Sequence, residues 1–160
     1  VSLADEIILM KDGIIEQQGT AEDIFNKPKS AFVADFIGSA NLVPAVVKGE
    51  EDKCYLLETP EKVQVKANKS DNLLSKGQSV QLVMRPENIY LSKEKKDGWS
   101  VNSWQCDVVV PNYLGTQTRY VISFQSRRLF VTILGSTQAF HANEKVYVHI
   151  PPEEIQILEE

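Results

Sequence analysis

The sequence predicts a mainly β protein that is preceded by a short β-hairpin and two short helices. Two observations support this fold class. From residue 41 to residue 160, short apolar or alternating runs recur between turn residues, at the spacing of an all-β barrel or sandwich, and no helical period is convincing. Before residue 40, helix-capping residues follow an Asp-Gly turn. We therefore expect the architecture to change near residues 38–42.

The first predicted element is a hairpin over residues 3–19. An apolar run at residues 7–10 is followed by Lys11-Asp12-Gly13 and then by Ile14 and Ile15. Asp-Gly between two apolar runs is a strong short-range hairpin signal, because glycine accepts the positive φ of a tight turn. We expect the second strand to end at Gly19.

Two short helices are expected next. The Thr20 hydroxyl can accept from the amide of Asp23 and so begin a helix over 21–26, which Pro28 ends. Ser30 caps a second helix, and Gly38 stands at the usual C-terminal position. The apolar face of this second helix carries Phe32, Val33, Phe36 and Ile37.

The rest of the chain predicts strands. The runs lie at 42–47, 54–57, 63–65, 80–84, 89–91, 106–110, 119–124, 129–134, 146–150 and 155–158. Alternation over 119–124 and 129–134 indicates a hairpin with one buried face. Segments 83–89 and 148–155 both read strand, Pro, Glu, strand, which indicates an internal repeat, with chance as the alternative.

Composition limits the functional classes. The chain has 160 residues, 18.0 kDa and a net charge of −5, which allows one core of ordinary size and argues against nucleic-acid binding. Cys54 and Cys106 lie far apart without metal-site spacing, which predicts reduced thiols, with a disulfide as the alternative. No leader or membrane-length apolar run is present. Because the chain begins at Val1, we expect it to be part of a longer protein.

A search for chemistry yields few candidates. The phosphate-cradling, nucleophile-elbow and zinc-protease motifs are absent from the sequence. His149 is expected on a strand and His141 in a solvated turn. Residues 115–118, Gly-Thr-Gln-Thr, fit either a small-ligand loop or a tight strand connection, and we favour the connection. The Arg85-Pro86-Glu87 element ends a strand. Arg85 could bind a carboxylate in bidentate fashion, pinning two elements or two subunits, or form an ordinary surface ion pair.

Two stretches resemble one known family. Residues 2–39, SLADEIILMKDGIIEQQGTAEDIFNKPKSAFVADFIGS, resemble the part of an ABC-transporter ATPase subunit that follows the switch histidine, with Ala21 where the family commonly has proline. Residues 83–89, VMRPENI, resemble the signature of the transport-associated OB (TOBE) domain. Tyr113-Leu114-Gly115 with Tyr120 is similar to the second half of that domain.

The resemblance implies an OB-like β-barrel over residues 41–160 that follows an ATPase-domain tail at residues 1–40. It implies a regulatory and dimerisation module of an importer ATPase. This portion would not itself be an enzyme, without catalytic, cofactor or metal residues, and ATP and magnesium would belong to the parent chain. The implied partners are a second copy, the rest of the ATPase and membrane permease subunits, but no nucleic acid, at the cytoplasmic face of the membrane. The interface or regulatory candidates are Arg85, Pro86, Glu87, Tyr113, Gly115 and Thr116.

An alternative from the same family is a domain that senses oxyanions such as molybdate or sulfate. Ser39-Ala40-Asn41-Leu42 is faintly similar to the start of that binding motif, but the basic residue and the downstream glycine are missing. OB-type binding of single-stranded nucleic acid is a more remote alternative. It would need stacking aromatics such as Tyr90, Trp99, Trp104 and Tyr113 on a basic groove. The resemblance leaves the transported solute open.

Overall fold

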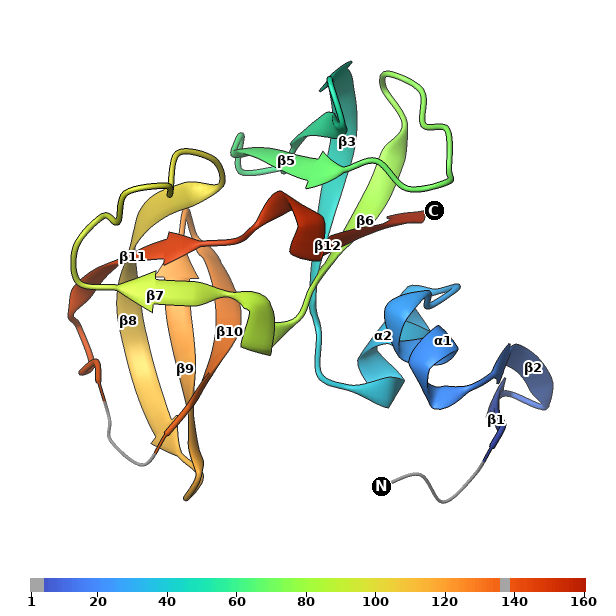
Figure 1. The fold of residues 1–160 in the computed structure, drawn as a ribbon, viewed down its shortest axis with the longest axis horizontal. Coiled ribbons are helices and arrows are strands. Elements are labelled where there is room, and N and C mark those ends of the chain that lie inside the picture. The colour runs from blue at the N-terminus through green and yellow to red at the C-terminus, as the bar shows by residue number, and fades with distance from the viewer. Residues whose placement is uncertain (1–4, 136–138) are drawn as a thin grey trace.

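The computed structural model describes residues 5–135 and 139–160 and confirms the mainly β prediction (Figure 1). Each apolar run predicted after residue 40 falls on or beside a strand. The elements in chain order are β1 (Ile7–Lys11), β2 (Ile14–Gly19), α1 (Ala21–Asn26), α2 (Ala31–Ile37), β3 (Asn41–Glu51), β4 (Cys54–Glu58), β5 (Gln64–Asn68), β6 (Ser79–Met84), η1 (Pro86–Asn88), β7 (Tyr90–Ser92), β8 (Ser103–Tyr113), β9 (Gln117–Phe124), β10 (Arg127–Leu134), β11 (Lys145–His149), η2 (Pro152–Glu154) and β12 (Ile155–Glu159).

The N-terminal elements form as their local signals predict. Strands β1 and β2 pair antiparallel around Asp12 and Gly13, whose φ angles are 50° and 79°. Thr20 Oγ1 accepts from the Asp23 amide at 3.1 Å, and Ser30 Oγ accepts from the Val33 amide at 3.3 Å, so both caps are confirmed. Residues 3 and 4 of the predicted hairpin lie outside the described residues.

Two details of the second helix differ from the prediction. Gly38 is extended, with φ −174°, and not left-handed. A Cβ there would lie 3.3 Å from the Phe25 ring, so the glycine allows a close approach between α1 and the end of α2. Phe36 was expected on the same face as its apolar neighbours but is 64% exposed. Phe32 and Ile37 pack partly against a small core of Leu9, Ile24 and Val33.

Two five-stranded antiparallel sheets build the barrel. Their strand orders are β12-β6-β3-β4-β5 and β10-β9-β8-β11-β7, and Figure 1 shows that each sheet is strongly curled. The alternating side chains of both sheets meet in one large core that is separate from the core of the N-terminal segment. The OB-like barrel is therefore confirmed, whereas a domain boundary at residue 40 stays a prediction.

The barrel is a duplicated unit, which confirms the predicted internal repeat at the level of topology. β3 to β7 and β8 to β12 follow the same order, each with a bulge in its first strand and a 3-10 turn before its last strand. The last strand of each unit joins the sheet of the other, because β7 pairs with β11 and β12 pairs with β6. The two halves are thus interlocked by exchanged strands.

Equivalent asparagines connect the two halves. The Asn41 amide donates to Met84 O at 3.2 Å and Phe130 O at 2.8 Å, and its oxygen accepts from Phe130 N at 2.8 Å. At the matching place, Asn102 donates to Lys66 O at 2.7 Å and Ile150 O at 2.9 Å, and accepts from Lys66 N at 2.8 Å. Each asparagine side chain therefore forms hydrogen bonds with backbone groups of both sheets, as a neighbouring strand would, and so connects them.

Candidate functional site

Arg85 connects the barrel to the N-terminal helices. It follows β6 directly, is only 3% exposed, and points toward α1 and α2. Its Nη1 donates to the carbonyls of Ala34 and Gly38, at 2.6 Å each, and its Nη2 donates to Phe25 O at 3.3 Å. The guanidinium also lies over the Phe25 ring, 4.3 Å from its centroid. One side chain thus binds both helices and the start of the connection to β3.

The electrostatics of Arg85 differ from the carboxylate pairing considered in the sequence analysis. Among residues 5–135 and 139–160, no ion pair forms with Arg85. Its acceptors are backbone carbonyls at the C-terminal ends of α1 and α2, where the helix dipoles are negative. Burial lowers the pKa of the guanidinium, while the charges of Glu87 and Asp35 act to raise it. Arginine nevertheless remains charged near neutral pH, because its ordinary pKa lies above about 12.

The neighbours of Arg85 in the RPE element have separate positions. Pro86 is buried at the first position of η1, where its missing N–H costs no helical hydrogen bond. Glu87 lies on the exposed side of the same turn. The element is therefore a corner that redirects the chain from β6 to β7, with only the arginine reaching the helices.

A second helix contact was not foreseen. Gln156, on β12, donates from Nε2 to Asn26 O at the end of α1, at 2.6 Å. Nothing in the sequence singles out this glutamine, because it lies 130 positions from its partner. With Arg85 it forms what we call the helix joint, defined by Arg85 and Gln156 on the barrel and by the carbonyls of Phe25, Asn26, Ala34 and Gly38.

The remaining candidates lie at the turn between β8 and β9. Gly115 has φ +89°, and Leu114 N donates to Gln117 O at 2.8 Å, so residues 115–118 begin with a tight strand connection. Gly115 and Thr116 are exposed, and Tyr113 is 56% exposed. Among the described residues, no hydrogen bond or ion pair joins this turn to Arg85, so the six candidates form two separate groups.

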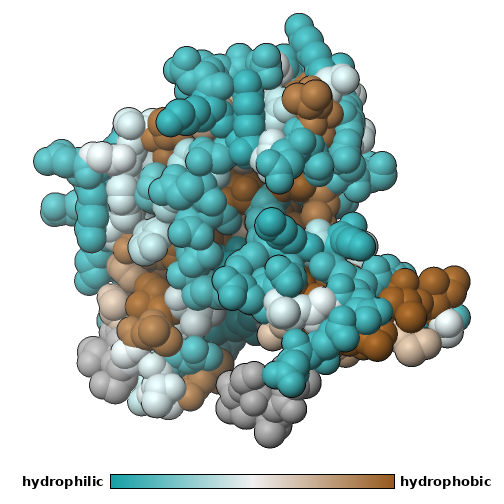
Figure 2. All heavy atoms as spheres, turned by 45° about the vertical axis from the view of Figure 1, so that its right-hand side comes forward, coloured by the Kyte–Doolittle hydropathy of each residue, from teal (hydrophilic) through white to brown (hydrophobic). Residues whose placement is uncertain are grey.

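Apolar side chains are exposed at both ends of the molecule. At the β8–β9 turn, Tyr113, Leu114 and Leu134 are 56%, 56% and 79% exposed. The N-terminal hairpin exposes another apolar group, and Figure 2 shows hydrophobic atoms gathered at that end of the molecule. The hairpin group consists of Ile8, Met10, Ile14 and Ile15. Exposed apolar clusters of this kind are typical of surfaces that contact another polypeptide.

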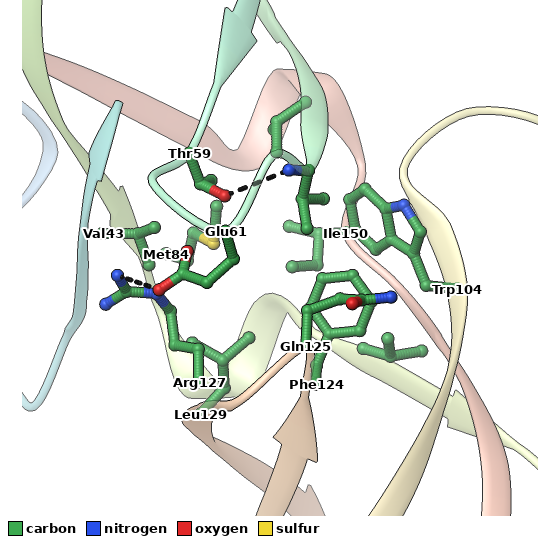
Figure 3. A pocket seen from close by; sticks show the side chains of 13 residues that line it. Val43, Thr59, Glu61, Met84, Trp104, Phe124, Gln125, Arg127, Leu129 and Ile150 are labelled. Atoms are coloured by element: carbon green, nitrogen blue, oxygen red, sulfur yellow. Dashed lines mark hydrogen bonds and ion pairs between the residues drawn. The ribbon is translucent and has the colours of Figure 1, made fainter. Parts of the chain in front are cut away.

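A small cavity lies between the two sheets (Figure 3). Apolar side chains such as Val43, Met84 and Phe124 line it, and an ion pair between Glu61 and Arg127, 2.6 Å long, lies at its edge. Burial acts to raise the pKa of Glu61, but hydrogen bonds from Arg127, its own amide and Thr59 lower it overall. The space of about 20 Å³ holds one water-sized molecule and no organic ligand.

Both histidines lie on or near β11. His149 lies on β11 and stacks on Trp99, with ring centroids 5.1 Å apart. His141 lies in the turn before β11. In the part of the chain that the structure describes, no group of His, Cys, Asp or Glu side chains could hold a metal ion. None of the described helices has the length and apolar character needed to cross a bilayer.

Comparison with known proteins identifies the class to which this interlocked β-barrel belongs. Residues 82–158 match the family model of the TOBE domain. The sequence is 35% identical to a spermidine/putrescine import ATP-binding protein of Protochlamydia amoebophila over 132 residues, which cover 82% of this chain and 35% of that protein. It is 31% identical to an iron(III) import ATP-binding protein of Brucella suis over 132 residues, which cover 82% and 35%.

The chain therefore carries a TOBE domain and is homologous to the C-terminal region of ABC importer ATP-binding subunits. It spans between about a third and two fifths of the length of the curated relatives that it matches, with 33% of the Thermotoga maritima spermidine/putrescine protein covered and 41% of the Acetivibrio thermocellus one. Among solved structures, the cytoplasmic molybdate-binding protein ModG superposes with a TM-score of 0.64 at 11% identity, covering 75% of this chain and 96% of that one. At that identity the likeness shows the fold alone.

Proposed function

We propose that this chain is the regulatory and dimerisation portion of an ABC importer ATPase. Residues 1–40 would be the tail of the ATPase domain and residues 41–160 the regulatory domain. The observation that carries the proposal is the homology to import ATP-binding proteins, which in one relative extends over 99% of this chain, tail and barrel together. The parent chain would bind ATP and magnesium at the cytoplasmic face and act with permease subunits.

The distribution of exposed apolar side chains supports this proposal. A hairpin with Met10 and Ile14 at 58% and 69% exposure would be covered by the ATPase domain. The apolar turn between β8 and β9 is the second exposed apolar surface, and we propose that it contacts a second copy of this chain. An isologous contact of this kind presents the same patch from both subunits.

Light scattering on a sizing column tests the dimer. We expect a mass near twice 18.0 kDa that persists on dilution. Leu114→Glu should reduce the mass to that of a monomer, because it places a charge in the apolar contact. Leu73→Glu, at a side chain 92% exposed in the loop before β6, is the matched control and should leave the dimer intact. A monomer at every concentration in the wild type would refute dimerisation through this domain.

Oxyanion binding is a second candidate, favoured by the likeness of fold to a protein whose structure holds molybdate. The geometry gives it little support, since the Asn41 amide, which lies in the candidate segment, is fully used between Met84 and Phe130. Calorimetry with molybdate, tungstate and sulfate separates the two functions. Absence of heat with all three anions would remove this candidate.

A further inference from the structure

The duplicated barrel provides an internal comparison for Arg85. The corner that contains Arg85 is repeated at Pro151, and in both corners the first carbonyl accepts from an amide three residues later, at 3.0 Å. Asn41 and Asn102 donate to the carbonyl just before each corner in the same way. Because Pro151 has no side-chain donor, a guanidinium is not required to build this corner.

The Arg85 side chain is therefore directed entirely at the N-terminal segment. Its three hydrogen bonds end on α1, on α2 and on Gly38, which begins the connection into β3. A planar fork with three acceptors from different segments restrains both rotation and translation of those segments. The Phe25 ring restrains the plane of the fork from one side.

The acceptors also explain how a buried cation is tolerated here. Ala34 and Gly38 lie at the C-terminal end of α2, and Phe25 lies in the last turn of α1. Carbonyls at helix ends lack intrahelical donors and carry partial negative charge. If the helices move away, the guanidinium loses all its acceptors at once, so the docked arrangement is favoured as a unit.

We propose that Arg85 is a positioning residue that locks the helical segment and the barrel in a single orientation, so that a displacement of the helices is passed to the barrel as a rigid movement. The local joint is argued from this chain alone. Its physiological meaning rests on the proposed function, in which the helices belong to the ATPase domain and Arg85 would carry its movement to the regulatory barrel.

Residual dipolar couplings of backbone amides test the joint on the whole chain. In the wild type, one alignment tensor should fit both the barrel strands and the helices α1 and α2. In Arg85→Met, which keeps the length of the side chain without its donors, the barrel couplings should persist. The helix couplings should fall at least about twofold, because the segment then reorients independently. Arg128→Met, at an exposed arginine of β10, is the matched control and should behave as the wild type.

Two further variants sharpen the test. Arg85→Lys keeps the charge without the fork, and helix couplings equal to those of the wild type would overturn the role of the planar contacts. Phe25→Ala removes the ring but not the arginine, and should loosen the helices without unfolding the barrel, which keeps the proposal testable if Arg85→Met does not fold.

The proposal is also overturned if one tensor of unchanged magnitude still fits Arg85→Met. Loss of the barrel itself in all three variants would equally overturn it, because Arg85 and Phe25 would then serve the barrel and not the joint. None of these outcomes depends on the mass of the protein in solution, so failure of the joint and failure of the dimer proposal are distinguishable.

Discussion

Asn102 is predicted to be among the most sensitive polar positions of the barrel. It lies at φ 51°, is 6% exposed, and makes three hydrogen bonds that connect β5 with the end of β11. A hydrogen bond contributes about 1 kcal/mol net, so Asn102→Ala removes about 3 kcal/mol from the free energy of unfolding. Placing alanine at positive φ adds roughly 1 kcal/mol of strain.

The total of about 4 kcal/mol is a large share of the roughly 5–15 kcal/mol that stabilises a typical domain. For a chain of this length it lowers the melting temperature by about 8–16 °C. Urea titration followed by Trp104 fluorescence measures the change, because Trp104 packs against Phe124 in the core, with centroids 4.9 Å apart. The slope of the transition should stay the same while its midpoint moves.

Two companion variants separate the contributions. Asn102→Gly loses the same hydrogen bonds without the strain, so we expect it to be less destabilising than Asn102→Ala, against the usual order of the two residues. Asn112→Ala, at an exposed position of β8, is the matched control and should change stability by less than about 0.5 kcal/mol. Equal effects of Asn102→Ala and this control would refute the bridging role.

Three other predictions follow from single contacts. Burial acts to raise the pKa of Glu61 on folding, but hydrogen bonds to Arg127 and the adjoining loop lower it overall. Its contribution to the free energy of unfolding is therefore complete above its ordinary pKa of 4.5. It is lost as the pH falls through the folded value, so urea midpoints measured against pH should fall less steeply in Glu61→Gln. Burial, with help from Asp107, raises the pKa of Cys106 to about 12, so an aromatic disulfide reagent at pH 8 should modify Cys54 in the native protein and both thiols only in urea. Thr20→Ala removes an N-cap worth about 1 kcal/mol and should speed amide exchange in α1 about fivefold, with strand amides unchanged.

Local signals in the sequence predicted the elements well. The Asp12-Gly13 turn, the Thr20 and Ser30 caps and the alternation over β9 and β10 each depend on neighbours a few positions apart, and each is confirmed. The exceptions are Gly38 and Phe36. Tertiary contacts decide the conformation of Gly38, because it lies close to the Phe25 ring of α1. The exposure of Phe36 likewise depends on how the helix packs and not on its own period.

The connections between distant segments could not be predicted in the same way. The sequence predicts the RPE element as a contact point, but the choice of helix carbonyls over a carboxylate depends on residues 47 to 60 positions away. Glu61 and Arg127 form an ion pair although they lie 66 positions apart, and no sequence motif predicts this pair. The sequence marks Asn41 only as part of a faint ligand motif and does not mark Asn102. An asparagine whose side-chain amide connects two strands has no sequence pattern of its own.

Because the two halves exchange their terminal strands, the first sheet gains its last strand only near the end of synthesis. β6 exposes one edge to solvent until β12 arrives, and β12 begins 71 positions after β6 ends. Throughout that interval the first sheet is an open template for foreign strands. Neither half can close its own sheet, so truncation before Ile155 should yield an aggregating chain and not a smaller barrel. For the same reason, two separately expressed halves should become soluble only when they are made together.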